Sequence, residues 1–272
     1  MLLAIDVGNT NTVLGLFDEA GQLAADWRLT TQRAQTVDEY GVLFRNLFSL
    51  RQIEVSAVTA IIVSSVVPPL DTTLRAMCER YFGHQPLFVE PGVKTGLAIR
   101  TDNPAEVGAD RIANCVAAFH KYGGPCIVVD LGTATSFDVV SQHGEFLGGA
   151  IAPGLGISAD ALFSRAARLM RVDIRRPSKV IGTNTVDALQ SGLFYGYLGL
   201  IDGVLERLLQ ELSTEARVIA TGGLANQLAQ ESRYISQVDD WLTLEGLLLI
   251  HQRNHSSTPH SRTRKAPSAP EA

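Results

Sequence analysis

LLAIDVGNTNT, at residues 2–12, has a counterpart at mid-chain in CIVVDLGTATS, at residues 126–136. In both stretches a short apolar strand ends in an acid, Asp6 or Asp130, and a turn of glycine and small hydroxyl or amide residues follows. A second strand comes next, so each stretch predicts a β-hairpin with a carboxylate at the end of its first strand. Backbone N–H groups and Thr or Asn side chains in such a turn can surround phosphate oxygens, and the carboxylate can hold a cation. Two copies on opposite halves of the chain therefore indicate two related domains that face one nucleotide.

A single copy of this pattern is weak evidence, because a strand that ends in Asp-x-Gly is usually part of an ordinary hairpin. The matching apolar leaders of the two copies favour the functional interpretation. A third segment, VIATGGLA at residues 218–225, is a strand that ends in a glycine pair and opens a helix. Taken alone, this segment is also compatible with an ordinary turn between a strand and a helix.

The composition indicates a globular chain. Its 272 residues suffice for one large or two modest domains, and 46% hydrophobic with 19% charged residues predicts a substantial core. No apolar stretch approaches the ~18 residues of a membrane span, so we expect no membrane contact, and Asp6 arrives too early for a signal peptide. The three cysteines, Cys78, Cys115 and Cys126, form no CxxC pair, so we expect buried, reduced thiols in a cytoplasmic protein.

The charge argues against a nucleic-acid partner. The chain has a net charge of −5, and residues 251–272 are basic, which leaves the rest of the chain more acidic still. These last residues are rich in Ser, Thr, Pro and His with few apolar side chains, so we expect a disordered tail. Its histidines could catch a metal ion by chance, but no cysteine or acid completes a site.

The order of the predicted elements is that of an α/β protein with two similar halves. The first half has strands near 2–6, 12–18, 22–29, 60–65 and 86–90, helices near 37–49 and 69–82, and a loop at 91–103. The second half has strands near 126–130, 135–141, 144–151 and 217–221, and helices near 157–169, 185–212, just after Gly223 and near 241–251. We therefore expect an N-terminal domain at 1–115, a C-terminal domain at 116–250 and the tail at 251–272.

A helix with strong start signals joins the two halves. Asp102 or Asn103 can cap it, Pro104 suits its first position, and we expect it to continue to residue 121, before a Gly-Gly-Pro stop.

This helix carries Gly108, Ala109, Asp110 and Arg111, and the first two leave a bare patch within its first two turns. The patch is compatible with close packing on a neighbouring helix, in which case Asp110 is a solvated acid that suits the helix dipole. It is equally compatible with a small molecule lying against the backbone. Asp110 could then accept a proton from a hydroxyl group, and Arg111 could bind an anion with two hydrogen bonds.

Other nucleotide motifs are absent or poorly placed. The chain has no GxxxxGK[ST] loop, so phosphoryl transfer of the P-loop type is excluded. GLGISA at residues 154–159 fits the dinucleotide pattern GxGxxA, but Pro153 precedes it and the strands before it are predicted to be antiparallel. We therefore interpret this segment as a tight turn that lets the chain pass near a ligand or a partner.

With these motifs the chain resembles the type III pantothenate kinases over roughly residues 1–250. The resemblance rests on the first turn at 6–12, DNPAEVGADR at 102–111, DLGTAT at 130–135 and GGAIAPG at 148–154, with TGG at 221–223 in support. Any one motif points only to the wider superfamily of sugar kinases, acetate kinases, actin and DnaK-type chaperones, whereas their order and spacing together are specific. The resemblance implies an α/β fold of two RNase H-like domains of the actin-like ATPase type, with ATP in the cleft between them.

The resemblance also implies a reaction and its cofactors. The reaction is the ATP-dependent phosphorylation of pantothenate to 4′-phosphopantothenate, the first step of coenzyme A biosynthesis. The implied cofactors are a divalent cation such as Mg²⁺ and a monovalent cation, K⁺ or NH₄⁺, and the implied assembly is a cytoplasmic homodimer.

Carried over residue by residue, the resemblance assigns roles to particular side chains. ATP binding falls to Thr133 and to the first turn, which comprises Asp6, Val7, Gly8, Asn9, Thr10, Asn11, Thr12 and Val13. Asp6 would also lie near the magnesium ion, and Asp130 would bind the monovalent cation. Asp110 would be the general base, for which an ordinary Asp pKa of about 4 is adequate. The pantothenate pocket would be lined by Gly108, Ala109, Asp110 and Arg111, and by Thr185 contributed from the partner subunit.

One position departs from the family pattern, because Thr101 stands where these kinases often have a tyrosine. The change could loosen the pocket or alter the substrate preference. Two alternatives remain: a non-catalytic nucleotide-binding regulator on the same fold, and a small kinase for another hydroxyl substrate. The presence of both Asp110 and Asp130 favours a working kinase, and the absence of an appended substrate domain disfavours an actin- or chaperone-like role. The helix near 185–212 and the turn at 153–156 are candidates for the dimer interface, and both are also compatible with a place in the core.

Overall fold

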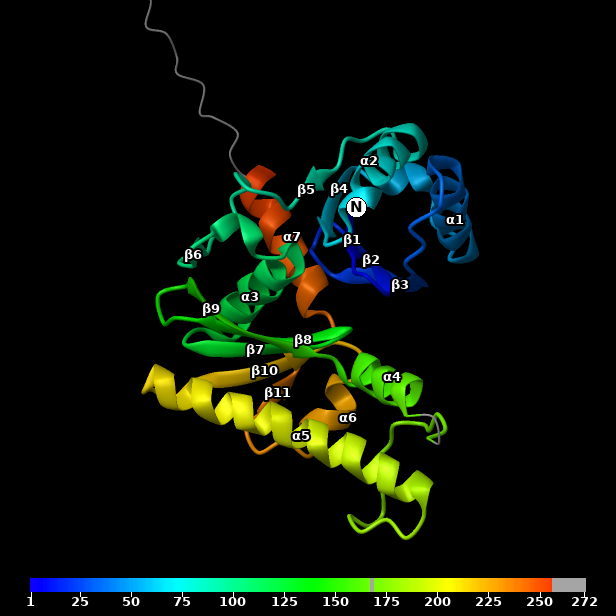
Figure 1. Ribbon diagram of the computed structural model, residues 1–272. Coiled ribbons are helices and arrows are strands. Elements are labelled where there is room, and N and C mark those ends of the chain that lie inside the picture. Colours follow the sequence, from blue (N-terminus) through cyan, green and yellow to red (C-terminus); the bar gives the residue numbers. More distant parts are fainter. Residues whose placement is uncertain (167–168, 256–272) are drawn as a thin grey trace, which may run out of the picture.

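The computed structural model describes residues 1–166 and 169–255 and contains two β-sheets. The strands of the first sheet are, in order, β3 (Leu23–Thr30), β2 (Asn11–Phe17), β1 (Leu2–Val7), β4 (Ala60–Ser65) and β5 (Leu87–Phe88). Those of the second are β11 (Gln237–Val238), β10 (Arg217–Thr221), β7 (Cys126–Leu131), β8 (Ala134–Val140), β9 (Glu145–Pro153) and β6 (Ala98–Ile99). The α-helices are α1 (Val37–Leu50), α2 (Pro68–Phe82), α3 (Ala109–Tyr122), α4 (Leu155–Arg165), α5 (Thr185–Leu212), α6 (Ala225–Ala229) and α7 (Leu242–His255). Figure 1 shows α1 and α2 beside the first sheet and α5 beside the second, with α3 and α7 between the two halves.

Strands β1 and β2 form the hairpin that the first motif predicts. They pair antiparallel with Asp6 opposite Val13, and β1 also pairs in parallel with β4. Because side chains alternate along a strand, Leu3 and Ile5 enter the core under α1 and α2, whereas Ala4 packs on the opposite face of the sheet. Asp6 shares the face of Ala4, so its carboxylate points toward the centre of the molecule.

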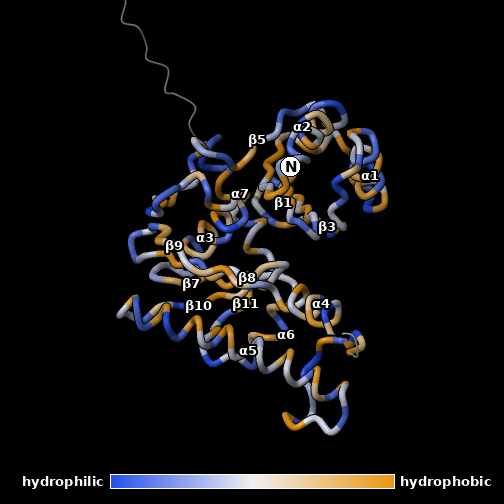
Figure 2. The backbone as a smooth tube through the Cα atoms, in the orientation of Figure 1, coloured by the Kyte–Doolittle hydropathy of each residue, from blue (hydrophilic) through white to orange (hydrophobic). Residues whose placement is uncertain are grey.

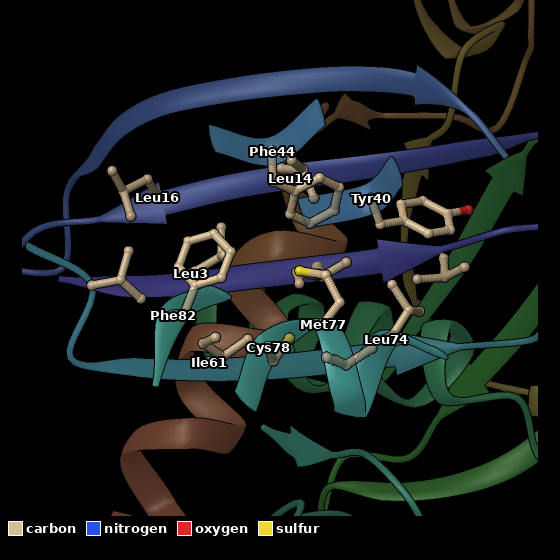
Figure 3. Close-up of a cluster of buried hydrophobic side chains, with 14 of the residues drawn as sticks. Leu3, Leu14, Leu16, Tyr40, Phe44, Ile61, Leu74, Met77, Cys78 and Phe82 are labelled. Carbon is tan, nitrogen blue, oxygen red and sulfur yellow. The ribbon is translucent and has the colours of Figure 1, made fainter. Parts of the chain in front are cut away.

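The core of the first half lies between this sheet and helices α1 and α2 (Figure 3). Leu3 and Leu14 from the strands meet Phe44 from α1 and Met77 from α2, all fully buried. Capping fixes the start of α1, since Thr36 and Glu39 form a reciprocal capping box. This packing makes the first sheet a rigid support for the β1–β2 turn.

Strands β7 and β8 repeat the hairpin in the second half. They pair antiparallel with Asp130 opposite Ser136, and β10 pairs in parallel with β7. Helix α5 covers one face of this sheet and buries Phe194, Ile201 and Leu205 against it. Figure 2 shows apolar colour along β7 and β8 and alternating apolar and polar stretches along α5, as expected for a helix with one buried face.

Helices α3 and α7 join the two halves. Ile112 of α3 packs with Leu247 of α7 against the first sheet, while Cys115 on another side of α3 packs against the second. The two helices lie so close that a Cβ atom on Gly246 would come within 1.9 Å of the Ala113 carbonyl oxygen, so glycine is needed there. The last described helix thus returns to cover the sheet formed by the first strands.

These helices bear on the predicted domain limits. The predicted boundary between residues 115 and 116 falls inside α3, which contributes to both cores, so the division into 1–115 and 116–250 stays a prediction. Helix α7 continues to His255, so residues 251–255 of the predicted tail are helical. The remainder of that tail, 256–272, lies outside the described residues. No helix among residues 1–166 and 169–255 is long and apolar enough to cross a membrane.

The start of α3 corrects the sequence prediction. Pro104 opens only a short 3₁₀ turn that ends at Glu106, and extended backbone at Val107 separates it from the α-helix. The helix begins at Ala109, with Gly108 as its N-cap residue. Gly108 therefore precedes the helix, and its carbonyl accepts the first helical hydrogen bond, from the Ile112 N–H.

Smaller differences concern short strands and one helix. The predicted loop at 91–103 contains β6, and β11 was not predicted; each pairs over only two residues, too few for a periodic signal. Helix α4 begins at Leu155 and ends at Arg165, rather than spanning 157–169.

Candidate active site

The two hairpin turns open onto one cavity of about 600 Å³ between the sheets. The first turn contributes Asp6, Gly8, Asn9, Thr10, Asn11 and Val13 to its lining, and the second contributes Thr133. Val7 and Thr12 are 1% exposed and point away from the cavity. Of the predicted ATP-binding residues, these two can reach a ligand in the cavity only through the backbone.

The two turns also touch each other. The hydroxyl oxygens of Thr10 and Thr133 lie 2.8 Å apart and share a hydrogen bond. The first turn is tight, because the Gly8 N–H donates to the Asn11 carbonyl at 2.9 Å. Arg33 holds the turn from outside by donating to the Asn9 side chain at 2.7 Å. Donor groups from both halves of the molecule therefore meet at one point of the cavity.

Five carboxylates line this cavity: Asp6, Asp110 and Asp130, which the sequence predicts for the site, together with Asp160 and Asp240. Burial, followed by the negative charge of Asp110, raises the pKa of Asp6 to about 8 and that of Asp130 to about 7. Among the described residues, Asp6 Oδ1 is buried without a hydrogen-bond partner. A buried carboxylate oxygen without a donor, close to other acids, is a position that suits a cation.

Asp130 is held by a relay of hydrogen bonds that the sequence did not reveal. Thr243 Oγ1 on α7 donates to Asn114 Oδ1 on α3 at 2.6 Å, and Asn114 Nδ2 donates to Asp130 Oδ2 at 3.2 Å. The other oxygen, Oδ1, lies beside the backbone of Gly222, where a Cβ atom would be only 2.6 Å away. The relay fixes one oxygen, and the other lies against the Gly222 backbone.

Asp110 occupies the first turn of α3. Its Oδ1 accepts a hydrogen bond from the Arg111 N–H at 2.8 Å, and a Cβ atom on Gly108 would lie 2.5 Å from the same oxygen. Glycine at 108 therefore makes room for the carboxylate. Burial raises the pKa of Asp110 above its ordinary value, while the Arg111 N–H and guanidinium act in the opposite direction. The pKa of Asp110 thus lies above the ordinary Asp value, because the helix start is desolvated.

Arg111 is already paired. Its Nε and Nη2 donate to Asp138 Oδ1 at 2.8 and 2.5 Å, and Asp138, which is fully buried, also accepts from the Ser136 hydroxyl at 2.9 Å. Arg111 still lines the cavity, with 18% of its side chain exposed. Only part of its guanidinium remains for a substrate, which the sequence did not indicate.

The other residues predicted for the substrate pocket lie outside this lining. Gly108 and Ala109 are adjacent to Asp110, but neither lines the cavity, and Ala109 is buried in the core shared by α3 and α7. Thr185 is exposed at the start of α5, away from the cavity. Thr101 is partly buried, and its hydroxyl has no hydrogen-bond partner among the described residues.

Two further segments behave as the sequence suggested. Strands β8 and β9 are antiparallel, which confirms that the GxGxxA match is not a dinucleotide fingerprint. A Cβ atom on Gly154 would lie 2.2 Å from the Thr133 carbonyl oxygen, so this glycine lets the chain pass against the second turn. The third segment reaches the cavity with Thr221, Gly222 and Gly223.

Within the described ranges, no group of three or more His, Cys, Asp or Glu side chains is arranged to hold a metal ion on its own. A cation at Asp6 or Asp130 would therefore need further oxygen ligands from water or from phosphates. Mg²⁺ is commonly bound in this manner, through one or two carboxylates together with substrate phosphates.

Solved structures establish the fold. A ROK family glucokinase from Streptomyces griseus, in complex with glucose and AMPPNP, matches with a TM-score of 0.55 at 11% identity, over 94% of this chain and 99% of that chain. The activator of the 2-hydroxyisocaproyl-CoA dehydratase from Clostridium difficile, with bound ADPNP, matches with a TM-score of 0.52 at 14% identity. This match covers 98% of this chain and 99% of that chain. The predicted α/β fold of the actin-like and sugar kinase superfamily is confirmed.

Sequence comparison identifies the family. The family described as type III pantothenate kinase matches residues 2–207. A type III pantothenate kinase from Koribacter versatilis (strain Ellin345) is 62% identical over 95% of this chain and 97% of its own length. Another type III pantothenate kinase, from Acidobacterium capsulatum, is 57% identical over 96% of this chain and 98% of its own length. The chain therefore belongs to the type III pantothenate kinase family.

Proposed function

We propose that this protein transfers the γ-phosphoryl group of ATP to the primary hydroxyl of pantothenate, the first step of coenzyme A biosynthesis. The observation that carries the proposal is the position of Asp110, whose carboxylate faces the cavity that both hairpin turns line. Membership of the family named for this reaction supports the choice of substrate.

The chemistry follows from the positions of the side chains. Backbone N–H groups and hydroxyls of the two turns, including Thr10 and Thr133, bind the ATP phosphates. Asp110 accepts the proton of the attacking hydroxyl while the new oxygen–phosphorus bond forms and ADP leaves. The raised pKa of Asp110 suits this role, because a base works best when its pKa lies near the working pH.

A kinase of this family requires a divalent cation together with ATP. We propose that Asp6 holds Mg²⁺, since its buried Oδ1 has no partner among the described residues. We propose Asp130 as the site of K⁺ or NH₄⁺, because its pKa is raised to about 7 by burial and by the charge of Asp110. When bound, these ions offset the negative charge of the acids and phosphates, in turns that supply no lysine.

The pantothenate pocket lies beside Asp110 and Arg111 in this proposal. The remaining donors of Arg111 face the pantothenate carboxylate, and Gly108 and Ala109 support the pocket from behind, where Gly108 leaves room for the Asp110 carboxylate. Thr185 contributes from the partner subunit, since it is exposed at the start of α5 and does not line its own chain's cavity.

A homodimer in the cytoplasm completes the proposal. Large apolar side chains stay exposed outside the cavity lining on β9 and α4, namely Leu147 and Leu162. Along α5, a Cβ atom on Gly192, Gly196 or Gly199 would meet nothing within 4 Å, so another helix can approach closely there. The free thiols of Cys78, Cys115 and Cys126 are compatible with a reducing compartment.

The decisive experiment measures ADP release from ATP and Mg²⁺, with and without pantothenate, in potassium and in sodium buffer. We expect turnover that depends on pantothenate and on potassium, with 4′-phosphopantothenate identified by mass spectrometry. ATP binding without pantothenate-dependent turnover would overturn the substrate assignment. Equal turnover in sodium would remove the monovalent-cation assignment and leave the reaction intact.

A further inference from the structure

Arg28 is a cationic side chain of the cavity that neither of the two motifs contains. It lies on β3, at the edge of the first sheet, and lines the cavity between the sheets. Strand pairing places Arg28 opposite Val13 of β2, and Val13 opposite Asp6 of β1. Directly paired residues project on the same face of a sheet. Arg28, Val13 and Asp6 therefore form one row on the face toward the second half of the molecule.

The alternation along β3 supports this orientation. Ala25 is buried in the core under α1 and α2, and Trp27 and Leu29 pack against the same core. Arg28 lies between Trp27 and Leu29, so its side chain must leave the opposite face. Neighbouring strands are about 4.8 Å apart, which puts Arg28 roughly 10 Å from Asp6, with Val13 between them. A phosphate held at the first turn can lie over this gap, where it can accept hydrogen bonds from Arg28 and share a cation with Asp6.

The guanidinium of Arg28 is uncommitted. Within the part of the chain that the structure describes, it makes no ion pair and no hydrogen bond, and the side chain is exposed. The nearby arginines differ in this respect, since Arg111 is bound to Asp138 and Arg33 to Asn9. Arg28 is thus the arginine of the cavity whose donors are all available to a ligand.

The lining of the cavity has more acidic than basic side chains, so an arginine there offsets negative charge. Its acidic lining residues are Asp6, Asp110, Asp130, Asp160 and Asp240, against two arginines, Arg28 and Arg111. The positive charge of Arg28 acts on Asp6 and on Asp130 together, lowering the pKa of each against the larger effect of burial. One guanidinium therefore influences the acids of both hairpins.

We propose that Arg28 binds the terminal phosphate of ATP and stabilises the negative charge on the phosphoryl group during transfer. This inference rests on the proposed kinase function and adds a catalytic residue to it. As the substrate oxygen bonds to the γ-phosphorus, the bond to the bridging oxygen breaks and ADP carries away the electron pair. Charge spreads over the equatorial oxygens of the moving group, where a planar, two-donor cation is effective.

The test compares Arg28→Gln and Arg28→Lys with wild type and with Arg51→Gln, a change of an exposed arginine at the end of α1, outside the cavity. Calorimetric titration with AMPPNP and with ADP, both with Mg²⁺, measures the contribution of the terminal phosphate without turnover. Arg28→Gln should weaken AMPPNP binding about tenfold or more, while ADP affinity changes less than about twofold. In kinetics, Arg28→Gln should lower kcat about 100-fold or more, and Arg28→Lys should recover part of the loss.

The outcomes separate this inference from the proposed function. AMPPNP and ADP affinities that fall equally in Arg28→Gln, or kcat within about twofold of wild type, would overturn the role of Arg28. A rise in the KM for pantothenate alone would instead assign Arg28 to the substrate carboxylate, and would also overturn it. If wild type shows no pantothenate-dependent turnover, the proposed function fails, but the AMPPNP and ADP comparison still decides whether Arg28 binds the terminal phosphate.

Discussion

Gly222 gives the sharpest test of how the second hairpin is held. Its φ of +93° lies in the left-handed region, and a Cβ atom there would come within 2.6 Å of Asp130 Oδ1 and 2.8 Å of the Leu131 backbone. The strand backbone cannot retreat, because β7 is paired on both sides. We expect Gly222→Ala to lower the free energy of unfolding by about 1–2 kcal/mol through the backbone conformation and by about 1–3 kcal/mol through overpacking. The total loss of stability is about 2–5 kcal/mol.

The adjacent glycine supplies a matched control for stability. A Cβ atom on Gly223 would meet nothing within 4 Å, and Gly223 is not among the positive-φ glycines. Gly223→Ala should therefore change the free energy of unfolding by less than about 0.5 kcal/mol. Urea denaturation followed by circular dichroism measures both variants. Similar midpoints for Gly222→Ala, Gly223→Ala and wild type would refute the packing described around Asp130.

Three further predictions concern the base, the hydrogen-bond relay and the end of α7. Asp110→Asn should lower kcat about 10²- to 10⁴-fold while calorimetric ATP affinity stays near wild type, and a folded variant with normal kcat would exclude Asp110 as the base. Thr243→Val removes the hydroxyl that orients the Asn114 amide toward Asp130, so the potassium concentration for half-maximal activation should rise about 5- to 10-fold. Thr243→Ser, which keeps the hydroxyl, should behave as wild type. If the Thr243→Val and Thr243→Ser variants show the same potassium dependence, the relay does not support the cation site. Burial, followed by a neighbouring histidine, lowers the pKa of His251 to about 4. The folded state then binds fewer protons than the unfolded state between about pH 4 and 6.5, so stability falls as the pH falls through this range. His251→Gln should flatten that dependence in urea denaturation at several pH values, and an unchanged slope would count against the burial of His251.

The hairpins were predictable because their signal is local. An apolar strand followed by an acid and a glycine specifies both the strand and its turn, and it occurs twice. Equivalent places in two similar halves bring Asp6 and Asp130 to the same cavity. The sequence therefore sufficed for the fold and for the two carboxylates, since no distant contact was needed to infer them.

The contacts of Arg111 depended on distant parts of the chain. Asp138 is 27 residues away from Arg111 and reaches it only because β8 packs against α3. In a sequence, a free arginine and a paired arginine are indistinguishable. The predicted start of α3 was wrong because Pro104 suits a 3₁₀ turn as well as an α-helix. The path of α7 back to the first sheet is also a matter of tertiary packing.

Arg28 could have been found from the sequence. Ala25, Trp27 and Leu29 alternate with Asp26 and Arg28, which places the charged side chains on the face opposite the apolar ones. The pattern does not show which part of the molecule lies beside this charged face. Only the pairing of β3 with β2, and of β2 with β1, puts the charged face of β3 beside Asp6.

The electrostatics of the cleft constrain what can bind there. Burial and the charge of Asp110 raise the pKa values of Asp6 and Asp130 to about 8 and 7, so at neutral pH a positive charge close to these acids favours their full ionisation. A triphosphate alone would add negative charge to the same space and make their ionisation still less favourable. Cations that accompany the nucleotide reverse this effect, because each one interacts with a carboxylate and with a phosphate at once. Nucleotide and cations must therefore favour the binding of each other, and by linkage this coupling is mutual. Arg28 and Arg111 supply fixed positive charge in the lining, but two arginines do not offset five acids and a triphosphate, so mobile cations must supply the remainder.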